Sequence, residues 1–148
     1  MTYSQPGTPG YAPAPAPATY ASWIKRVGAA LIDGLVILPF NALALLLGRS
    51  DDGLNALYFV FALLGLIVTG YNRWFQAGKT GQSWGKKALG LRLVGEQTGQ
   101  PIGAGLAFAR DLAHFVDSIV CYIGYLFPLW DAKKQTLSDK IVKTVVLS

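Results

Sequence analysis

Ionisable side chains interrupt two apolar stretches of the chain, where they could bind an ion or relay protons. Asp33 lies within the apolar run 27–47, and a later apolar region, 106–130, carries four more such residues, Arg110, Asp111, His114 and Asp117. A charged side chain at the centre of a bilayer helix costs about 2.5–3.5 kcal/mol or more, so it must face protein or water, be paired, or hold a proton. The candidate ligand- or proton-binding residues are therefore Asp33, Arg110, His114 and Asp117.

Three of these candidates form a pattern that is typical of one helix face. Arg110, His114, Asp117 and Cys121 follow one another at spacings of four, three and four residues. If this polar stripe docks on the first apolar helix, we expect Arg110 or His114 to pair with Asp33. The pairs could line a cavity that binds a cation or relays protons, or they could only fasten the helices together. For Cys121, the single cysteine, we expect a packing role.

Other kinds of chemistry find little support in the residue pattern. A single histidine and a single cysteine cannot form a usual metal cage, and no nucleophile, base and orienting group occur together. The segment 78–80 ends like a phosphate-binding loop, but Arg73 stands where that motif requires glycine. We predict no enzymatic activity, no metal and no cofactor.

The composition indicates a lipid environment. Apolar residues make up 52% of the chain and charged residues only 14%, whereas soluble domains have about 25% charged residues. The run 27–47 has 21 residues, which at about 1.5 Å per residue can cross a hydrocarbon core of about 30 Å. The run 54–71 gives a second span, so we predict a transmembrane helical hairpin in the lipid bilayer.

The distribution of charge predicts the orientation of this hairpin. The net charge is +5, but the basic residues lie mainly beside the apolar runs, which favours a topology signal over a nucleic-acid surface. Lys25 and Arg26 precede the first span and the loop 72–105 is basic, whereas the connection 48–53 carries two aspartates. We predict a multi-pass protein of the bacterial inner membrane with a cytoplasmic N-terminus, and no nucleic-acid partner.

The glycine-bounded segment 81–90 is expected to lie at the membrane surface. Trp84 and Leu89 could enter the interface while Lys86 and Lys87 meet anionic lipid headgroups. An ordinary solvated basic loop is the alternative.

The apolar region 106–130 is too interrupted to read as a simple span. Its uncharged second half has about 13 residues, fewer than the roughly 20 that a span needs. We favour a broken, re-entrant or interfacial helical region, because 91–94 and 144–147 both read as short strands that can pair only on the same side. The predicted fold class is an all-α integral membrane protein with this third region and a small cytoplasmic two-stranded sheet.

The chain divides into two parts by composition. Residues 1–21 are rich in proline and alanine and are expected to be disordered, because they hold too few large apolar side chains to offset the entropy of ordering. Residues 22–148 are expected to form the membrane domain.

Several separated motifs in this second part resemble the RDD family, which is named for one arginine and two aspartates. They are Arg26, Asp33, the segment 81–94 and the ending 130–147. The resemblance implies that Arg26, Asp33 and Asp139 are the naming residues, with Asp131 as the alternative to the last. It also implies a membrane protein of unknown function for which transport of a ligand has been suggested.

Arg26 is expected to reach the C-terminal tail rather than Asp33. The two residues lie on one helix face about 10 Å apart along the axis, and arginine side chains lean toward the N-terminus of a helix. A bidentate contact with Asp139 or Asp131 is therefore favoured. The leading hypothesis is a homo-oligomeric transporter or transport accessory, since two spans alone give little wall for a pathway. The alternative is a non-catalytic membrane adaptor or scaffold with structural charges.

Overall fold

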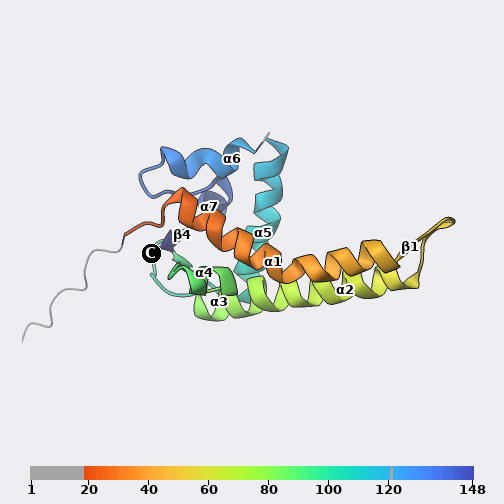
Figure 1. The fold of residues 1–148 in the computed structure, drawn as a ribbon. Coiled ribbons are helices and arrows are strands. Elements are labelled where there is room, and N and C mark those ends of the chain that lie inside the picture. The colour runs from red at the N-terminus through yellow and green to blue at the C-terminus, as the bar shows by residue number, and fades with distance from the viewer. Residues whose placement is uncertain (1–18, 121) are drawn as a thin grey trace, which may run out of the picture.

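The computed structural model describes residues 19–120 and 122–148 as a mostly helical chain with small antiparallel sheets (Figure 1). The helical elements are α1 Trp23–Leu47, α2 Ala56–Thr69, the π-helix η1 Gly70–Gln76, α3 Ala77–Thr80, α4 Trp84–Ala88, α5 Ala104–Ile119, α6 Ile123–Leu126, the 3₁₀-helix η2 Phe127–Leu129 and α7 Leu137–Val142. The strands are β1 Arg49–Ser50, β2 Gly53–Leu54, β3 Arg92–Gly95 and β4 Thr144–Leu147.

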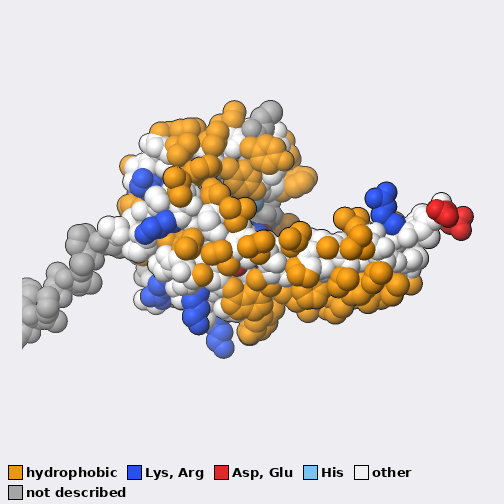
Figure 2. Space-filling model, viewed as in Figure 1, with side chains coloured by type: hydrophobic (Ala, Val, Ile, Leu, Met, Phe, Trp, Pro, Cys, Tyr) orange, Lys and Arg blue, Asp and Glu red, His pale blue; other side chains and the backbone are white. Residues whose placement is uncertain are grey.

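Two antiparallel helices form a long hairpin that matches the two predicted spans. The first is α1, and the second runs without a break from Ala56 to Thr80; each has 25 residues and is long and apolar enough to cross a membrane. Their outward surfaces are covered by large apolar side chains such as Leu31, Leu35 and Phe59 (Figure 2). A helix pair in water would turn large apolar side chains inward, away from solvent. Because these side chains point outward, the hairpin surface suits a lipid environment.

The second helix of the hairpin extends beyond the predicted end at Tyr71 and passes through a π-helical turn. This turn, η1, continues into α3, and the helix ends at Gly81 with a left-handed backbone (φ 80°). A π-helical turn rotates the following side chains relative to an α-helix and is frequent at functional sites. Here it holds Asn72 against α1, whereas Arg73 and Trp74 contact α5.

The third apolar region is broken, as predicted. Helix α5 ends at Ile119, and the pair α6 and η2 continues at 109° to it. Gly124 of α6 packs directly on Asp117 of α5, and a Cβ at this position would overlap the carboxylate. Cys121 lies outside the described residues, so the packing role expected for it is not described.

A small sheet closes the end of the molecule opposite the hairpin tip. Strands β3 and β4 pair antiparallel with Arg92 opposite Leu147 and Gly95 opposite Thr144, which confirms the predicted pairing one residue later in β3. The apolar cluster behind this sheet contains Ala21, Ala29, Leu91, Leu93 and Val146.

The start of the described chain joins this sheet. The N–H of Ala21 donates to the carbonyl of Val146 at 2.9 Å, and Ala21 is fully buried. The expected disorder of residues 1–21 is therefore wrong for 19–21, where backbone hydrogen bonds to β4 hold the chain. Residues 1–18 lie outside the described part. We call the end of the molecule formed by α4, β3, β4, α6 and α7 the cap.

Candidate functional site

Asp33 is buried in the wall between the hairpin and the cap, and neutral groups satisfy its carboxylate. Oδ1 accepts hydrogen bonds from Nδ2 of Asn72 and the backbone N–H of Gly85, both at 2.8 Å. Oδ2 accepts one from Oγ of Ser83 at 2.6 Å. The prediction that Arg110 or His114 pairs with Asp33 is wrong, because η1 and α4 occupy the space on that side of α1.

The local sequence explains how α4 reaches Asp33. Ser83 is the N-cap of α4, and the first N–H groups of a helix have no partner within it. Asp33 accepts from one of these groups, and Asn72 accepts from another, the N–H of Trp84, at 2.8 Å. A Cβ at Gly85 would overlap the carbonyl oxygen of Ala29, so only glycine permits this close approach.

Asp139 lies between two arginines on the other side of the cap. Its Oδ1 accepts from Nε of Arg110 at 2.6 Å and from Oγ1 of Thr144 at 3.1 Å, and its Oδ2 forms an ion pair with Arg26. Asp139 is fully buried and also closes a capping box with Thr136 at the start of α7. The predicted pairing of Arg26 with Asp139 is confirmed, but the bidentate geometry is wrong, because Nη2 of Arg26 binds Asp139 while Nη1 donates to the carbonyl of Lys134.

The alternative partner, Asp131, does not reach Arg26. Its carboxylate accepts from Nζ of Lys140 at 2.6 Å and from the backbone N–H groups of Lys133 and Gln135 at 3.2 and 3.0 Å. Burial alone would raise the pKa of Asp139, but the positive charges of Arg110 and Arg26 hold that pKa well below its usual range. Asp139 is therefore ionised at neutral pH.

The polar stripe of α5 faces α6 and α7 instead of the hairpin. Nδ1 of His114 lies 2.7 Å from Oδ2 of Asp117 and 2.8 Å from Oγ of Ser138. The imidazole stacks on the ring of Tyr125 with centroids 5.1 Å apart. Oδ1 of Asp117 has no hydrogen-bond partner among the described residues. Arg110 and Asp117 are buried, and the contacts of the stripe fasten α5 to the cap instead of to Asp33.

A further ion pair that the sequence did not predict joins η1 to α5. Nη2 of Arg73 donates to Asp111 at 2.8 Å, and Nε1 of Trp74 donates to the same carboxylate at 2.9 Å. This contact fixes the distance between the hairpin and α5, and it leaves open space between them.

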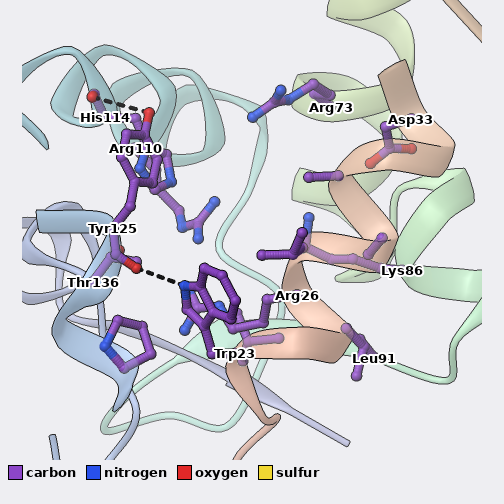
Figure 3. A pocket seen from close by; sticks show the side chains of 15 residues that line it. Trp23, Arg26, Asp33, Arg73, Lys86, Leu91, Arg110, His114, Tyr125 and Thr136 are labelled. Carbon is purple, nitrogen blue, oxygen red and sulfur yellow. Dashed lines mark hydrogen bonds between the residues drawn. The ribbon is translucent and has the colours of Figure 1, made fainter. Parts of the chain in front are cut away.

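That space is a cavity of about 370 Å³, here called the basic cavity. Its charged lining residues come from α1, η1, α4 and α5, and Figure 3 shows Arg73 and Arg110 extending into it from facing sides. The charged or titratable lining residues are Arg26, Asp33, Arg73, Lys86, Arg110 and His114. The remaining wall is mostly apolar or aromatic and includes Trp23, Leu91, Tyr125, Pro128 and Val146.

Lys86 lines this cavity instead of lying on the exposed surface of α4, where we expected both lysines. It lies on the face of α4 that packs on α1, whereas its neighbour Lys87 is exposed. Burial lowers the pKa of Lys86 to about 8, and the positive charges of Arg110 and Arg73 lower it further in the same direction. Its Nζ has one weak contact among the described residues, 3.5 Å from Oγ of Ser83.

A smaller cavity of about 270 Å³ lies within the hairpin, between α1 and the helix formed by α2 and η1. We call it the hairpin cavity; polar side chains of Asn41, Thr69 and Asn72 contribute to its lining. It shares Ala30, Asp33 and Arg73 with the basic cavity. These three residues therefore form the partition between the two spaces.

Metal binding is not suggested by the described side chains, among which no three His, Cys, Asp or Glu residues are grouped to hold an ion. The basic cavity instead offers several hydrogen-bond donors beside an apolar wall, an arrangement suited to binding a polar ligand.

The sequence model of the RDD family matches residues 20–143. The chain belongs to the RDD family. Family membership and the two long apolar helices together indicate a membrane protein.

Three relatives show how far the similarity extends. The chain is 39% identical to the proline-rich antigen of Mycobacterium leprae over 153 residues and 36% identical to the proline-rich antigen homolog of Mycobacterium tuberculosis over 150 residues. Each match covers 86% of this chain but only 61% and 62% of the relatives. An uncharacterized protein of Haemophilus influenzae is 30% identical over 138 residues, covering 90% of this chain and 81% of that protein. No solved structure matches the chain.

Asn72, Ser83, Gly85 and Lys86 are the site residues that sequence reasoning missed. The signal available for three of them was the glycine-bounded segment 81–90, whose serine and glycine are the residue types that cap a helix and permit close backbone approach. Asn72 had no such signal, because its orientation depends on the π-helical turn.

Proposed function

We propose that this RDD protein is a multi-pass inner-membrane protein that transports a small ligand, or assists its transport, through the basic cavity and the hairpin cavity. The observation that supports this is the shared partition, because Ala30, Asp33 and Arg73 line both spaces. Polar groups thereby continue from the cap into the middle of the hairpin. Two spans enclose little space, so the proposal includes a homo-oligomer that completes the pathway.

In this proposal the cap lies in the cytoplasm and the hairpin tip lies outside. Lysines and arginines gather at the cap, whereas Asp51 and Asp52 form the tip (Figure 2). This distribution follows the positive-inside tendency. Exposed cationic side chains such as Lys79 and Lys87 are then placed to contact anionic headgroups.

A substitution at the partition tests the proposal. Ala30→Trp places a large side chain between the two cavities, and Leu31→Trp places the same side chain on the neighbouring position, which is 64% exposed and faces outward. Purified protein in liposomes is assayed for fluxes of protons, sodium, potassium, chloride and phosphate. We expect at least one flux above that of empty liposomes, lost with Ala30→Trp and retained with Leu31→Trp.

Either of two results would overturn transport: no flux from the wild type, or equal flux from both tryptophan variants. The melting temperature of each variant in detergent serves as the folding control. Asp33→Asn is a second probe, because it keeps the size of the side chain while removing the negative charge of the partition.

A non-catalytic adaptor is the alternative, and the ion pairs of the cap are the observation in its favour. Arg26, Arg110 and Asp139 join α1, α5 and α7, so these charges already have a structural role. An adaptor would give no flux and would instead bind a protein partner through the cap.

A further inference from the structure

We infer that the basic cavity is a binding site for a phosphate group, held by Lys86, Arg73 and Arg110, with the rest of the ligand against the apolar wall. This inference deepens the proposed function, because it names the class of ligand that the basic cavity would take. Binding of a phosphate group does not itself require transport, so the two can be tested separately.

Unused donors of the two arginines are the first support. Arg110 is only 6% exposed, and its Nε donates a hydrogen bond to Asp139. Its Nη1 and Nη2 have no partner among the described residues. Arg73 has a side chain that is 40% exposed; its Nη2 donates to Asp111, and its Nη1 and Nε have no partner among the described residues. These arginine nitrogens are not sealed from solvent, so they can donate to an acceptor that enters the cavity.

Lys86 is the second support, since this cavity residue forms no ion pair with a carboxylate in the part of the chain that the structure describes. Arg26 and Arg110 share Asp139, and Arg73 pairs with Asp111. The acidic residue among those lining the described cavity is Asp33, and both of its oxygens already accept hydrogen bonds. An ammonium group in this position destabilises the fold unless an anion joins it.

The geometry favours a phosphate group over a cation. The three donors come from η1, α4 and α5, three separate elements around one space (Figure 3). A tetrahedral phosphate has several acceptor oxygens pointing in different directions, so it can accept from all three elements at once. A cation in the same place would meet like charges.

The apolar part of the wall indicates what the phosphate group is attached to. Trp23, Tyr125, Pro128 and Val146 line the cavity along with the basic residues. The volume of about 370 Å³ falls in the range of small-ligand pockets, which begins near 300 Å³. The ligand is therefore a phosphate ester with an apolar body, which is either a soluble metabolite-like ester or the headgroup region of an anionic lipid.

Ligand binding to the full chain in a neutral detergent tests the site. Soluble and lipid probes are used separately, so that a soluble phosphate ester can be distinguished from a lipid headgroup. Calorimetric titration uses inorganic phosphate and hexyl phosphate, and a second arm uses nanodiscs of phosphatidylcholine with and without phosphatidic acid. Lys86→Gln is compared with Lys87→Gln, which removes an identical charge from the adjacent exposed position. A charge-assisted hydrogen bond contributes about 1.5 kcal/mol or more, so we expect Lys86→Gln to weaken binding about tenfold or more and Lys87→Gln to leave it unchanged.

Proton uptake is a second measurement that a merely structural lysine would not change. Lys86 is surrounded by groups from three elements: Arg26 and Asp33 of α1, Arg73 of η1, and Arg110, Asp111 and His114 of α5. An added anion favours the charged lysine, so binding at pH 8 should take up about half a proton per site and give an enthalpy that depends on the buffer. Lys86→Arg should bind without this dependence.

The outcomes separate this inference from the proposed function. Binding that Lys86→Gln weakens, without any flux, supports the phosphate site and overturns transport. Hexyl phosphate binding points to a soluble ester, and binding only in discs with phosphatidic acid points to a lipid. The inference is overturned if none of inorganic phosphate, hexyl phosphate and phosphatidic acid binds, or if Lys86→Gln and Lys87→Gln weaken binding equally.

Discussion

Asp139 of α7 and Arg26 of α1 form an ion pair across 113 residues of chain, and the carboxylate lies fully buried at the junction of the hairpin with the cap. Arg110 of α5 binds the other oxygen of the same carboxylate at 2.6 Å. One acidic side chain is therefore shared by two guanidinium groups, and the three side chains together keep one positive charge. Three elements depend on it for their arrangement.

Removing this carboxylate should destabilise the protein strongly. Asp139→Asn leaves two arginines without a counter-charge, and breaking a buried ion pair typically costs about 3–5 kcal/mol. We expect a comparable loss in the free energy of unfolding, measured by urea titration in detergent. Asp131→Asn is the matched control, because its pair with Lys140 is at the surface and should contribute about 1 kcal/mol or less. Equal losses in the two variants would contradict the assignment.

The same carboxylate should make the protein sensitive to acid. The pKa of Asp139 is lowered in the folded state, so its stabilising contribution is complete above the unfolded pKa of about 3.9. The contribution is lost as the pH falls below that value toward the folded pKa. We expect the melting temperature of the wild type to decrease steeply below about pH 4. The slope should be smaller in Asp139→Asn, and an unchanged slope would show that other groups govern acid unfolding.

The sequence predicted those features that depend on residue type and length. Uninterrupted apolar runs predicted the hairpin, and a single arginine near a membrane boundary predicted a carboxylate partner in the tail. The partners of Asp33 were not predicted, because they are an amide, a hydroxyl and a backbone N–H. These groups are uncharged, and the sequence reasoning looked for a charged partner. Lys86 and Lys87 looked equivalent for a related reason, since only the packing of α4 on α1 separates them.

Gly85 should tolerate no side chain. A Cβ there would overlap the backbone of α1 at Ala29 and crowd the carboxylate of Asp33, so α4 would have to move away. We expect Gly85→Ala to lower the free energy of unfolding by about 2 kcal/mol or more, within the range for overpacked sites. Gly105→Ala is the control, because a Cβ at that position of α5 meets open space and favours the helix. Similar stability of the two variants would show that α4 is not held against α1.

Lys86 should reduce the stability of the unliganded protein. Its pKa falls from 10.5 to about 8 on folding, so between pH 8 and 10.5 the unfolded chain binds more protons and stability rises with pH. Below pH 8 the full cost of the charged lysine remains. We expect Lys86→Met to raise the free energy of unfolding at pH 7 by about 1–3 kcal/mol, and the gain should disappear near pH 10.5. Lys87→Met should change it little, and a destabilised Lys86→Met would mean that the lysine has a partner.

The C-terminal end of β4 and the tip of the hairpin lie at opposite ends of the molecule, so labelling them can report the side of the membrane on which the cap lies. The N–H of Ser148 donates to the carbonyl of Thr19 at 2.9 Å, so the end of β4 lies beside the start of α1, whereas Ser50 lies at the far tip of the hairpin (Figure 1). Helix α1 has 25 residues, a length of about 37 Å, which exceeds a hydrocarbon core of about 30 Å. The two serines should therefore lie on opposite sides.

Single cysteines at these serines, in a Cys121→Ser background, report this arrangement. We expect Ser50→Cys to react with a membrane-impermeant maleimide in intact cells, and Ser148→Cys to react only after the membrane is opened. Thr19→Cys should follow Ser148→Cys, because both belong to the same edge of the cap. Labelling of Ser50→Cys and Ser148→Cys from the same side would require a third complete crossing by α5 and α6, and the cavities would then lie at a different depth in the membrane.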